Sequence, residues 1–253
     1  MRRVPLQDIV RACDLWLTPS QFKDYDGAVN GLQVENRTGV SKIAATVDAT
    51  LATVQKAIAI QADLLVVHHG LFWSPSHPWT GRRFELIRLL VENNLAVYSQ
   101  HLPLDAHPTL GNCARLARSL GARSLKPFFH DKGQHIGWRF EARMTREALH
   151  ARLSQVLGGP VTVLPGGGET CRHIGVCTGA AGSQAKLAAA EGVDTFITGE
   201  GPHWTHAVSE DLGLNVFYGG HYATETFGVK ALSERLARKF RVPWAFVDHP
   251  SGL

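Results

Sequence analysis

Hydrophobic residues along this chain fall into two kinds of segment that alternate. Some are short, nearly continuous apolar runs, which are typical of strands buried on both faces. Others are longer stretches in which apolar residues recur every three or four positions, as in helices with one apolar side. The alternation predicts an α/β fold with a mostly parallel sheet and helices on its faces. The first half has expected helices at 5–17, 50–61 and 82–94, and expected strands at 41–49, 62–70 and 95–101.

The same order of segments recurs in the second half of the chain. Residues 173–201 align with residues 42–70 without a gap, and after a shorter loop "NVFYGGHYATE" aligns with "LAVYSQHLPLD". Residues 134–164 are expected to open this half with a strand, a helix and a strand. Few aligned residues are identical, but the matches include polar residues that follow expected strands. We therefore predict two similar α/β halves with converging strand ends, formed by 1–127 plus 218–253 and by 128–217.

The basic residues of the chain give no sign of nucleic-acid binding. The net charge is +4 and the pI is near 9.0, and the densest basic stretch is "VKALSERLARKFR" near the C-terminus. Leu232, Leu236 and Phe240 lie at helical spacing there, so the charges are expected to form the solvated side of an amphipathic helix. There is no basic stripe interleaved with aromatic residues, and we predict no direct contact with nucleic acid.

Composition and cysteine usage favour an ordinary globular protein of the cytoplasm. Of 253 residues, 44% are hydrophobic and 19% are charged, which is far from the composition of disordered chains. No apolar run reaches the roughly 18 residues of a membrane-spanning helix, and the first residues lack the apolar segment of a signal peptide. The cysteines show no C-x-x-C spacing, so we expect reduced thiols and no cysteine-based zinc site at Cys13, Cys113, Cys171 and Cys177.

Candidate metal ligands follow the expected strands. His68 and His69 close the second strand, and Asp105 comes a short turn after the third. His221 follows "NVFYGG" in the second half, and Glu225 lies four residues later, on the same face if a helix opens near there. Because open α/β sheets bind ligands beyond the carboxyl ends of their strands, these side chains are expected to converge.

The donor types favour a pair of divalent ions. Three imidazoles and two carboxylates exceed the three or four ligands of one zinc ion, and carboxylates can bridge two ions. Nitrogen and oxygen donors together suit zinc, iron, manganese or cobalt. The adjacent His68 and His69 can reach one centre only where the strand ends, and Gly70 is expected to supply that turn. Two other interpretations stay open: hydrogen-bonded structural histidines, and Asp105 as a cap of the turn before the next helix.

Five motifs in this order resemble the Nif-three-like dinuclear metal centre family. They span most of the chain: "YDGAVNGLQVEN", "LLVVHHGLFW", "YSQHLPLDAHPTLGN", "FITGE" and "GGHYATETFGVKAL". The resemblance is to the short bacterial members, which lack an inserted domain. It implies two similar α/β domains, a hexameric ring and two divalent ions in each subunit. The family's metal ligands match the same five positions, His68, His69, Asp105, His221 and Glu225.

The resemblance also implies a catalytic function. Bacterial members carry the name GTP cyclohydrolase 1 type 2 homologue, which suggests hydrolytic opening of the imidazole ring of a purine nucleotide. Glu200 and His101 match family positions near the metals, and we expect them to be catalytic groups that move a proton; His101 would equally suit orienting Asp105. Phe72 and Trp73 are expected either to stack on a base or to pack between domains. Hydrolysis of a phosphoester or an amide fits the same ligands, and the alternative is a non-catalytic metal-dependent adaptor or metal chaperone.

Overall fold

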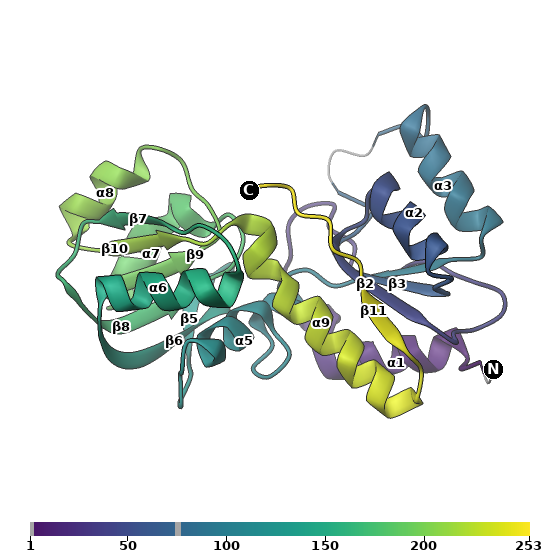
Figure 1. Cartoon of the computed structure of the whole chain (residues 1–253), viewed down its shortest axis with the longest axis horizontal. Coiled ribbons are helices and arrows are strands. Elements are labelled where there is room, and N and C mark those ends of the chain that lie inside the picture. The colour runs from purple at the N-terminus through teal and green to yellow at the C-terminus, as the bar shows by residue number, and fades with distance from the viewer. Residues whose placement is uncertain (1–2, 74–76) are drawn as a thin grey trace. The chain divides into compact units, whose positions relative to one another are not determined.

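The chain folds into two compact units, each built around one sheet (Figure 1). The computed structural model describes residues 3–73 and 77–253. The first unit comprises the described residues up to Leu104 together with Gly228–His249, and the second comprises Asp105–Phe227 and Pro250–Leu253. The predicted mixed α/β fold with two halves is confirmed.

The first unit contains a five-stranded sheet in the order β1-β4-β3-β2-β11. All neighbouring strands are parallel except β1, which runs antiparallel to β4 at one edge. The three strands expected in this half are present, and their apolar runs are buried as predicted. The strands are β1 (Gly31–Val34), β2 (Ile43–Asp48), β3 (Leu64–His69), β4 (Ala96–Ser99) and β11 (Trp244–Phe246).

Helices of the first unit begin where the local sequence allows it. Helix α2 (Leu51–Ala59) starts at a capping box, in which Thr50 and Thr53 each hydrogen-bond the other's backbone N–H. The helix buries Val54 and Ala57 in a core shared with the sheet. The other helices that begin in this unit are α1 (Leu6–Leu17), the short η1 (Pro19–Gln21), α3 (Arg82–Glu92) and α4 (Leu102–Ala106).

The second unit contains a six-stranded sheet in the order β5-β6-β8-β9-β10-β7. Its centre is parallel, but β5, β6 and β7 pair antiparallel with their neighbours, so the mostly parallel pattern expected from the sequence describes only the first sheet. The hairpin between β5 and β6 accounts for part of this difference, because Lys132 and Gly133 both have positive φ, as a tight two-residue turn requires. The strands are β5 (Lys126–Asp131), β6 (Gln134–Thr145), β7 (Thr162–Pro165), β8 (Thr170–Val176), β9 (Thr195–Thr198) and β10 (Asn215–Tyr218).

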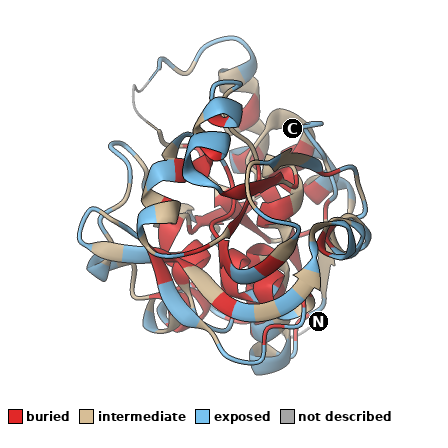
Figure 2. Cartoon of the chain, turned by 90° about the vertical axis from the view of Figure 1, so that its left-hand side faces the viewer, coloured by how far each residue is buried: buried red, intermediate tan, exposed pale blue. Residues whose placement is uncertain are grey.

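Helix packing explains where the second unit begins. Helix α5 (Asn112–Ser119) buries Leu116 in the same core as Leu149 and Leu153 of α6 (Arg146–Leu157) and Phe140 of β6. Figure 2 colours the chain by how far each residue is buried. Residues 105–127, 218–227 and 250–253 lie in the second unit, whereas the sequence had assigned them to the first. The remaining helices are η2 (Ala181–Gln184), α7 (Ala185–Ala190), α8 (Thr205–Leu212) and α9 (His221–Phe240), the last contributing residues to both units.

Helix α9 and the cysteines agree with the sequence-based expectations. The amphipathic helix is present, and Leu232 and Leu236 are fully buried along it. It begins at His221, two residues before the expected start. The four cysteines are buried free thiols. Within residues 3–73 and 77–253, no helix combines the length and the apolar character needed to cross a bilayer.

Candidate metal centre

Three histidines gather at the strand ends of the first unit. His68 and His69 are the last residues of β3, and His101 lies two residues after the end of β4. Their ring centroids lie 4.8 Å apart for His68 and His69 and 4.9 Å apart for His68 and His101. One ring nitrogen from each lies within 4.8 Å of the others, so the three side chains offer a compact set of nitrogen donors. The parallel neighbours β3 and β4 bring them together because both strands end at the same edge.

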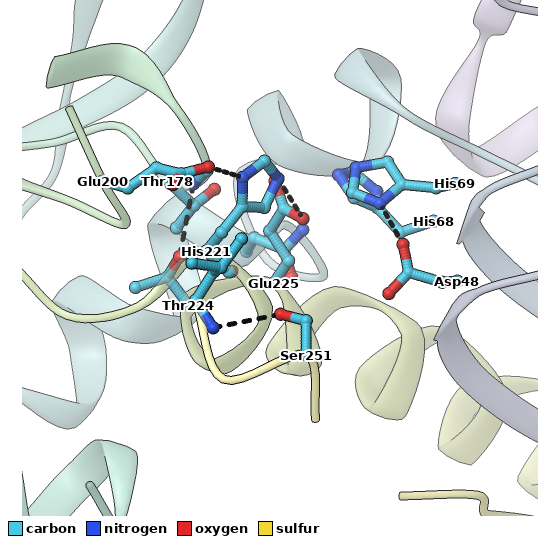
Figure 3. Close-up of polar contacts among 12 residues, drawn as sticks. Asp48, His68, His69, Thr178, Glu200, His221, Thr224, Glu225 and Ser251 are labelled. Atoms are coloured by element: carbon cyan, nitrogen blue, oxygen red, sulfur yellow. Dashed lines mark hydrogen bonds and ion pairs between the residues drawn. The ribbon is translucent and has the colours of Figure 1, made fainter. Parts of the chain in front are cut away.

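Each of these three rings is oriented through its Nδ1 atom. Nδ1 of His69 lies 2.7 Å from Oδ1 of Asp48 (Figure 3), and Nδ1 of His68 lies 2.9 Å from the carbonyl oxygen of Gln100. Nδ1 of His101 lies 2.7 Å from Oδ1 of Asp24. Carbonyl and carboxylate oxygens only accept, so Nδ1 is the donor in each pair and Nε2 carries the lone pair that can bind a metal.

Asp24 is the most firmly held of these acceptors. Burial alone would raise the pKa of its carboxyl group, but hydrogen bonds from His101, Asn30 and the Tyr25 N–H lower the pKa to about 2. The carboxylate is therefore charged at any pH near neutrality. It also accepts the N–H of Leu102 at the start of α4, so that Asp24 fixes both His101 and the turn that follows it. The sequence offered no pattern that marked Asp24.

The turn after the two adjacent histidines depends on Gly70, as expected. The reason is steric, because the side chain of Gln33 occupies the space that a side chain at position 70 would need. A Cβ atom on Gly70 would lie 2.2 Å from Nε2 of Gln33. The Oε1 atom of Gln33 accepts the N–H of Leu71 at 2.6 Å, and this contact holds the chain as it leaves β3. A larger residue at position 70 would displace Gln33 and loosen that turn.

A second group of ligands lies in the second unit. His221 is the first residue of α9 and Glu225 lies one turn later on the same side of the helix. Nε2 of His221 is 3.1 Å from Oε2 of Glu225, and Nδ1 of His221 is 2.7 Å from Oε1 of Glu200, which follows β9 (Figure 3). As in the first unit, an oxygen acceptor holds Nδ1 of the ring. Here Nε2 also faces a carboxylate, that of Glu225.

Protonation of His221 follows from these two carboxylates. Burial lowers its pKa, but the hydrogen bonds and charges of Glu225 and Glu200 outweigh burial and raise the pKa to about 9. In the metal-free protein the ring is thus an imidazolium at neutral pH. A cation that binds between Nε2 and the Glu225 carboxylate must displace this proton, and its binding releases a proton to solvent.

Asp105 lies close to Glu225 within the second unit. Oδ1 of Asp105 accepts hydrogen bonds from Nδ2 of Asn112 at 2.8 Å and from the hydroxyl of Thr178 at 3.0 Å. Oxygen atoms of Asp105 and Glu225 lie within 4.8 Å, and the two residues are only 6% and 3% exposed. Two buried carboxylates at this separation repel each other unless a proton or a cation lies near them. Gly111, and not Asp105, is the N-cap of α5, which excludes the capping interpretation.

A glycine leaves the space that Glu225 occupies. Gly179 follows β8 with φ +71°, and a Cβ atom there would lie 2.4 Å from Oε1 of Glu225. The N–H of Gly179 donates to the hydroxyl of Thr224, which ties this loop to the first turn of α9. Sequence reasoning had not selected Gly179, because its role depends on a neighbour far away in the chain.

The aromatic residues after the histidine pair have different surroundings. The ring of Trp73 lies edge-on to His101 at 4.9 Å and to His69 at 5.6 Å, and its Nε1–H donates to the carbonyl oxygen of Gly70. Phe72 instead packs against the ring of Trp79. Trp73 therefore covers the histidine group, whereas Phe72 contributes to the packing of the first unit.

Comparison with known proteins gives matches along nearly the whole chain. The family model described as Duf34/NIF3 (NGG1p interacting factor 3) matches residues 4–251. A Deinococcus radiodurans protein named GTP cyclohydrolase 1 type 2 homolog is 41% identical over 232 residues, which is 90% of this chain and 88% of that protein. An Archaeoglobus fulgidus protein of the same name is 38% identical over 248 residues, covering 98% of this chain and 99% of the relative.

Solved structures share the fold. A crystal structure of a Thermus thermophilus protein superposes with a TM-score of 0.91 at 37% identity and covers 99% of this chain and 100% of that one. A structure described as reduced HcgD from Methanocaldococcus jannaschii has a TM-score of 0.85 at 24% identity and covers 98% of this chain and 100% of that chain. These similarities confirm the resemblance found in the sequence.

Proposed function

Because the chain belongs to the Duf34/NIF3 family, we propose that it is a metal-dependent hydrolase that binds two divalent ions and acts on a nucleotide-like substrate. His68 and His69 of the first unit and Asp105, His221 and Glu225 of the second are the proposed ligands. Zinc, iron, manganese and cobalt suit these donors. The relatives' name supports a ring-opening reaction of the GTP cyclohydrolase type, and a phosphoester or an amide is chemically compatible with the same ligands.

One observation carries the proposal: three of the proposed ligands are histidines whose Nδ1 atom is held by an oxygen acceptor. The acceptors are Gln100, Asp48 and Glu200 for His68, His69 and His221. This hydrogen bond fixes the ring and its tautomer and raises the basicity of Nε2, and it accompanies nearly all metal-binding histidines. A single structural histidine can form such a hydrogen bond by chance. The same hydrogen bond at three histidines from distant segments of the chain favours metal binding.

The chain's own residues define the chemistry that we propose. When bound, two divalent cations lower the pKa of a water molecule and polarise the bond to be cleaved. His101 is the proposed proton-transfer group, because Asp24 holds its Nδ1 and leaves Nε2 to exchange a proton. Glu200 is the second proposed catalytic group: it orients His221 through one carboxylate oxygen, and its other oxygen is the one available to accept a proton.

Metal content is the first test of this function. We expect protein purified without added metal to contain close to two ions per chain by elemental analysis, and the His69→Ala variant to lose part of that content. The matched control is His206→Ala, because His206 is an exposed residue of α8 outside the ligand set. A ratio near zero in the unaltered protein would contradict the proposal.

Turnover is the second test. The metal-loaded chain would be incubated with purine nucleotides, phosphoesters and dipeptides, and we expect one class to be hydrolysed. The His101→Gln and Glu200→Gln variants should then lose most of the rate, by about 10²–10⁴-fold for a proton-transfer group, while the metals stay bound. Full metal content without turnover of any compound would favour the non-catalytic adaptor or metal chaperone instead.

The oligomeric state and the compartment are further parts of the proposal. We propose a hexamer, for which light scattering should give about six times the chain mass of 27.6 kDa. A mass equal to one or two chains would contradict the ring. The proposed cytoplasmic location is supported by four cysteines that are all free thiols.

A further inference from the structure

A pocket of about 740 Å³ lies on the second unit, and none of the proposed metal ligands lines it. Its walls come from the segment after α5, from β6 and β8, and from α6. The volume is within the range of sites that enclose small organic ligands. Its charge is unusual: five cationic side chains and a single acidic one line it, namely Arg123, Lys126, Arg139, Arg143, Arg152 and Glu141.

The pocket forms where β6 extends beyond its neighbour β5. The pairing of these two strands ends with Lys126 opposite Arg139, but β6 continues to Thr145. Over residues 140–145 the strand pairs with β8 on one side, with an irregularity between Glu141 and Met144. Beyond Arg139 no described strand pairs with the other edge of β6, and residues 120, 121, 123 and 124 line the pocket. Such an edge presents backbone N–H groups beside the arginines, which is a suitable setting for anionic oxygens.

The floor of the pocket is apolar and well fixed. Phe140 and Leu120 line the pocket and belong to the hydrophobic core of the second unit. Met144 also lines it and packs against the same core. A ligand in this pocket would therefore find an apolar surface below and cationic groups at the rim, as molecules with both an organic part and anionic groups require.

Contacts within the protein compensate little of this positive charge. Arg123 and Arg143 are exposed and form no ion pair among the described residues. Lys126 and Glu141 are 3.5 Å apart on the surface, where an ion pair contributes little. Arg139 donates to the carbonyl oxygen of Glu191, while its buried Nε has no hydrogen-bond partner within the described structure. A buried donor of this kind is unfavourable unless a ligand or water accepts its hydrogen bond.

We propose that this pocket binds a small phosphorylated organic molecule of nucleotide size, with its phosphate groups against the arginines and its organic part on the apolar floor. Bidentate contacts with phosphate oxygens are the characteristic use of arginine, and several arginines around one cavity suit a polyphosphate. The cations surround a cavity and do not form a stripe along a helix or sheet, which favours a small ligand over a nucleic-acid backbone. This site is independent of the proposed hydrolase function.

Calorimetric titration of the full chain with ATP and with inorganic tripolyphosphate tests the proposal. EDTA is included so that metal ions do not mediate binding. We expect saturable binding of both probes that weakens as KCl is raised, with ATP binding more tightly because it also covers the apolar floor. Arg123→Glu and Arg143→Glu should each weaken binding by about tenfold or more. Lys186→Glu is the matched control, since Lys186 is an exposed cation of α7 outside the pocket, and it should bind as the unaltered chain does.

Three results would overturn the proposal. The first is an absence of saturable binding by either probe, and the second is equal loss of affinity in the pocket variants and in Lys186→Glu. The third is tighter binding of a single-stranded RNA oligomer than of ATP, with the RNA binding weakened by the same substitutions. That result would assign the surface to nucleic acid. Arg143→Gln, which removes the charge without reversing it, replaces Arg143→Glu if that variant unfolds. Metal content is measured in parallel, so failure here is distinct from failure of the metal centre.

Discussion

Nδ1 of His69 donates a hydrogen bond to Oδ1 of Asp48 over 2.7 Å, and the two residues are directly paired at the ends of the parallel strands β3 and β2. The pairing places a carboxylate behind one member of the histidine pair. Asp48 thus has the position of a group that orients a metal ligand without binding the metal.

Replacement of Asp48 should weaken metal binding without unfolding the protein. We expect Asp48→Ala to lower metal affinity by about 10–100-fold, because the His69 ring loses the acceptor that fixes its orientation. Competition with a chelating dye measures the affinity. Asp8→Ala is the control, since Asp8 forms an ion pair with the nearby Arg11 on the surface of α1. Equal metal affinity in Asp48→Ala and in the unaltered chain would show that Asp48 does not orient His69 for metal binding.

The origin of Asp48's role shows what the sequence could and could not predict. Asp48 lies within the strand expected at 41–49, and polar residues at strand ends had directed attention to His68 and His69. Its partner depends on the register of β2 with β3, which hydrophobic patterning does not specify. Asp24 is a harder case, because it lies in a loop and its contact with His101 spans 77 positions. Local patterns contain no information about such contacts.

The fold shows the same division between local and non-local information. The apolar runs around Val66 and Val97 predicted buried parallel strands correctly, since the signal lies within each run. The antiparallel edge formed by β5 and β6 was not expected, although the turn at Lys132 and Gly133 gives a local signal for a hairpin. The boundary of the second unit depends on which core Leu116 joins, and that contact with Phe140, Leu149 and Leu153 is not encoded in the sequence near Leu116.

Substitution of Gly179 should affect the Glu225 group specifically. In Gly179→Ala the new Cβ would overlap Oε1 of Glu225, so we expect loss of metal affinity together with a loss of stability of about 2–4 kcal/mol from backbone strain and overpacking. Metal titration and urea unfolding measure the two effects.

A matched glycine separates the two causes. Gly213 has a similar φ of +62° at the end of α8, but nothing lies within 4 Å of the Cβ that Gly213→Ala would add. That variant should lose only the strain contribution, about 1–2 kcal/mol, and should keep its metal affinity. If both variants bind metal with normal affinity, the space that Gly179 leaves for Glu225 is not needed for metal binding.

His221 should titrate far above an ordinary histidine in the metal-free protein. Its pKa of about 9 lies above the unfolded value near 6.5, so its charged contacts stabilise the fold fully below about pH 6.5 and are lost as pH rises through 9. Glu200→Gln removes one of the two carboxylates and should shift this titration to lower pH. Nuclear magnetic resonance of the ring protons follows the titration directly, and an unshifted midpoint in the variant would contradict the assigned cause.

Asp24 should confer stability that disappears in acid. Its folded pKa of about 2 lies below the model-peptide value near 3.9, so its contribution is present above about pH 4 and is lost as pH falls towards 2. Urea unfolding at a series of pH values should therefore show a steeper decline below pH 4 for the unaltered chain than for Asp24→Asn. Parallel declines would show that Asp24 does not hold its charge through the contacts with His101, Asn30 and Tyr25.

Trp73 provides an optical signal for metal binding in the first unit. Its ring lies 5.6 Å from that of His69, so a paramagnetic ion bound to His69 would lie within quenching distance of the indole. We expect cobalt(II) to reduce tryptophan fluorescence in proportion to occupancy, and Trp73→Phe to remove most of that response while leaving cobalt affinity unchanged. Trp204→Phe is the control, because Trp204 is an exposed tryptophan of the second unit, and the response of Trp73 should remain in this variant. Quenching that persists in Trp73→Phe and disappears in Trp204→Phe would place the ion away from His69.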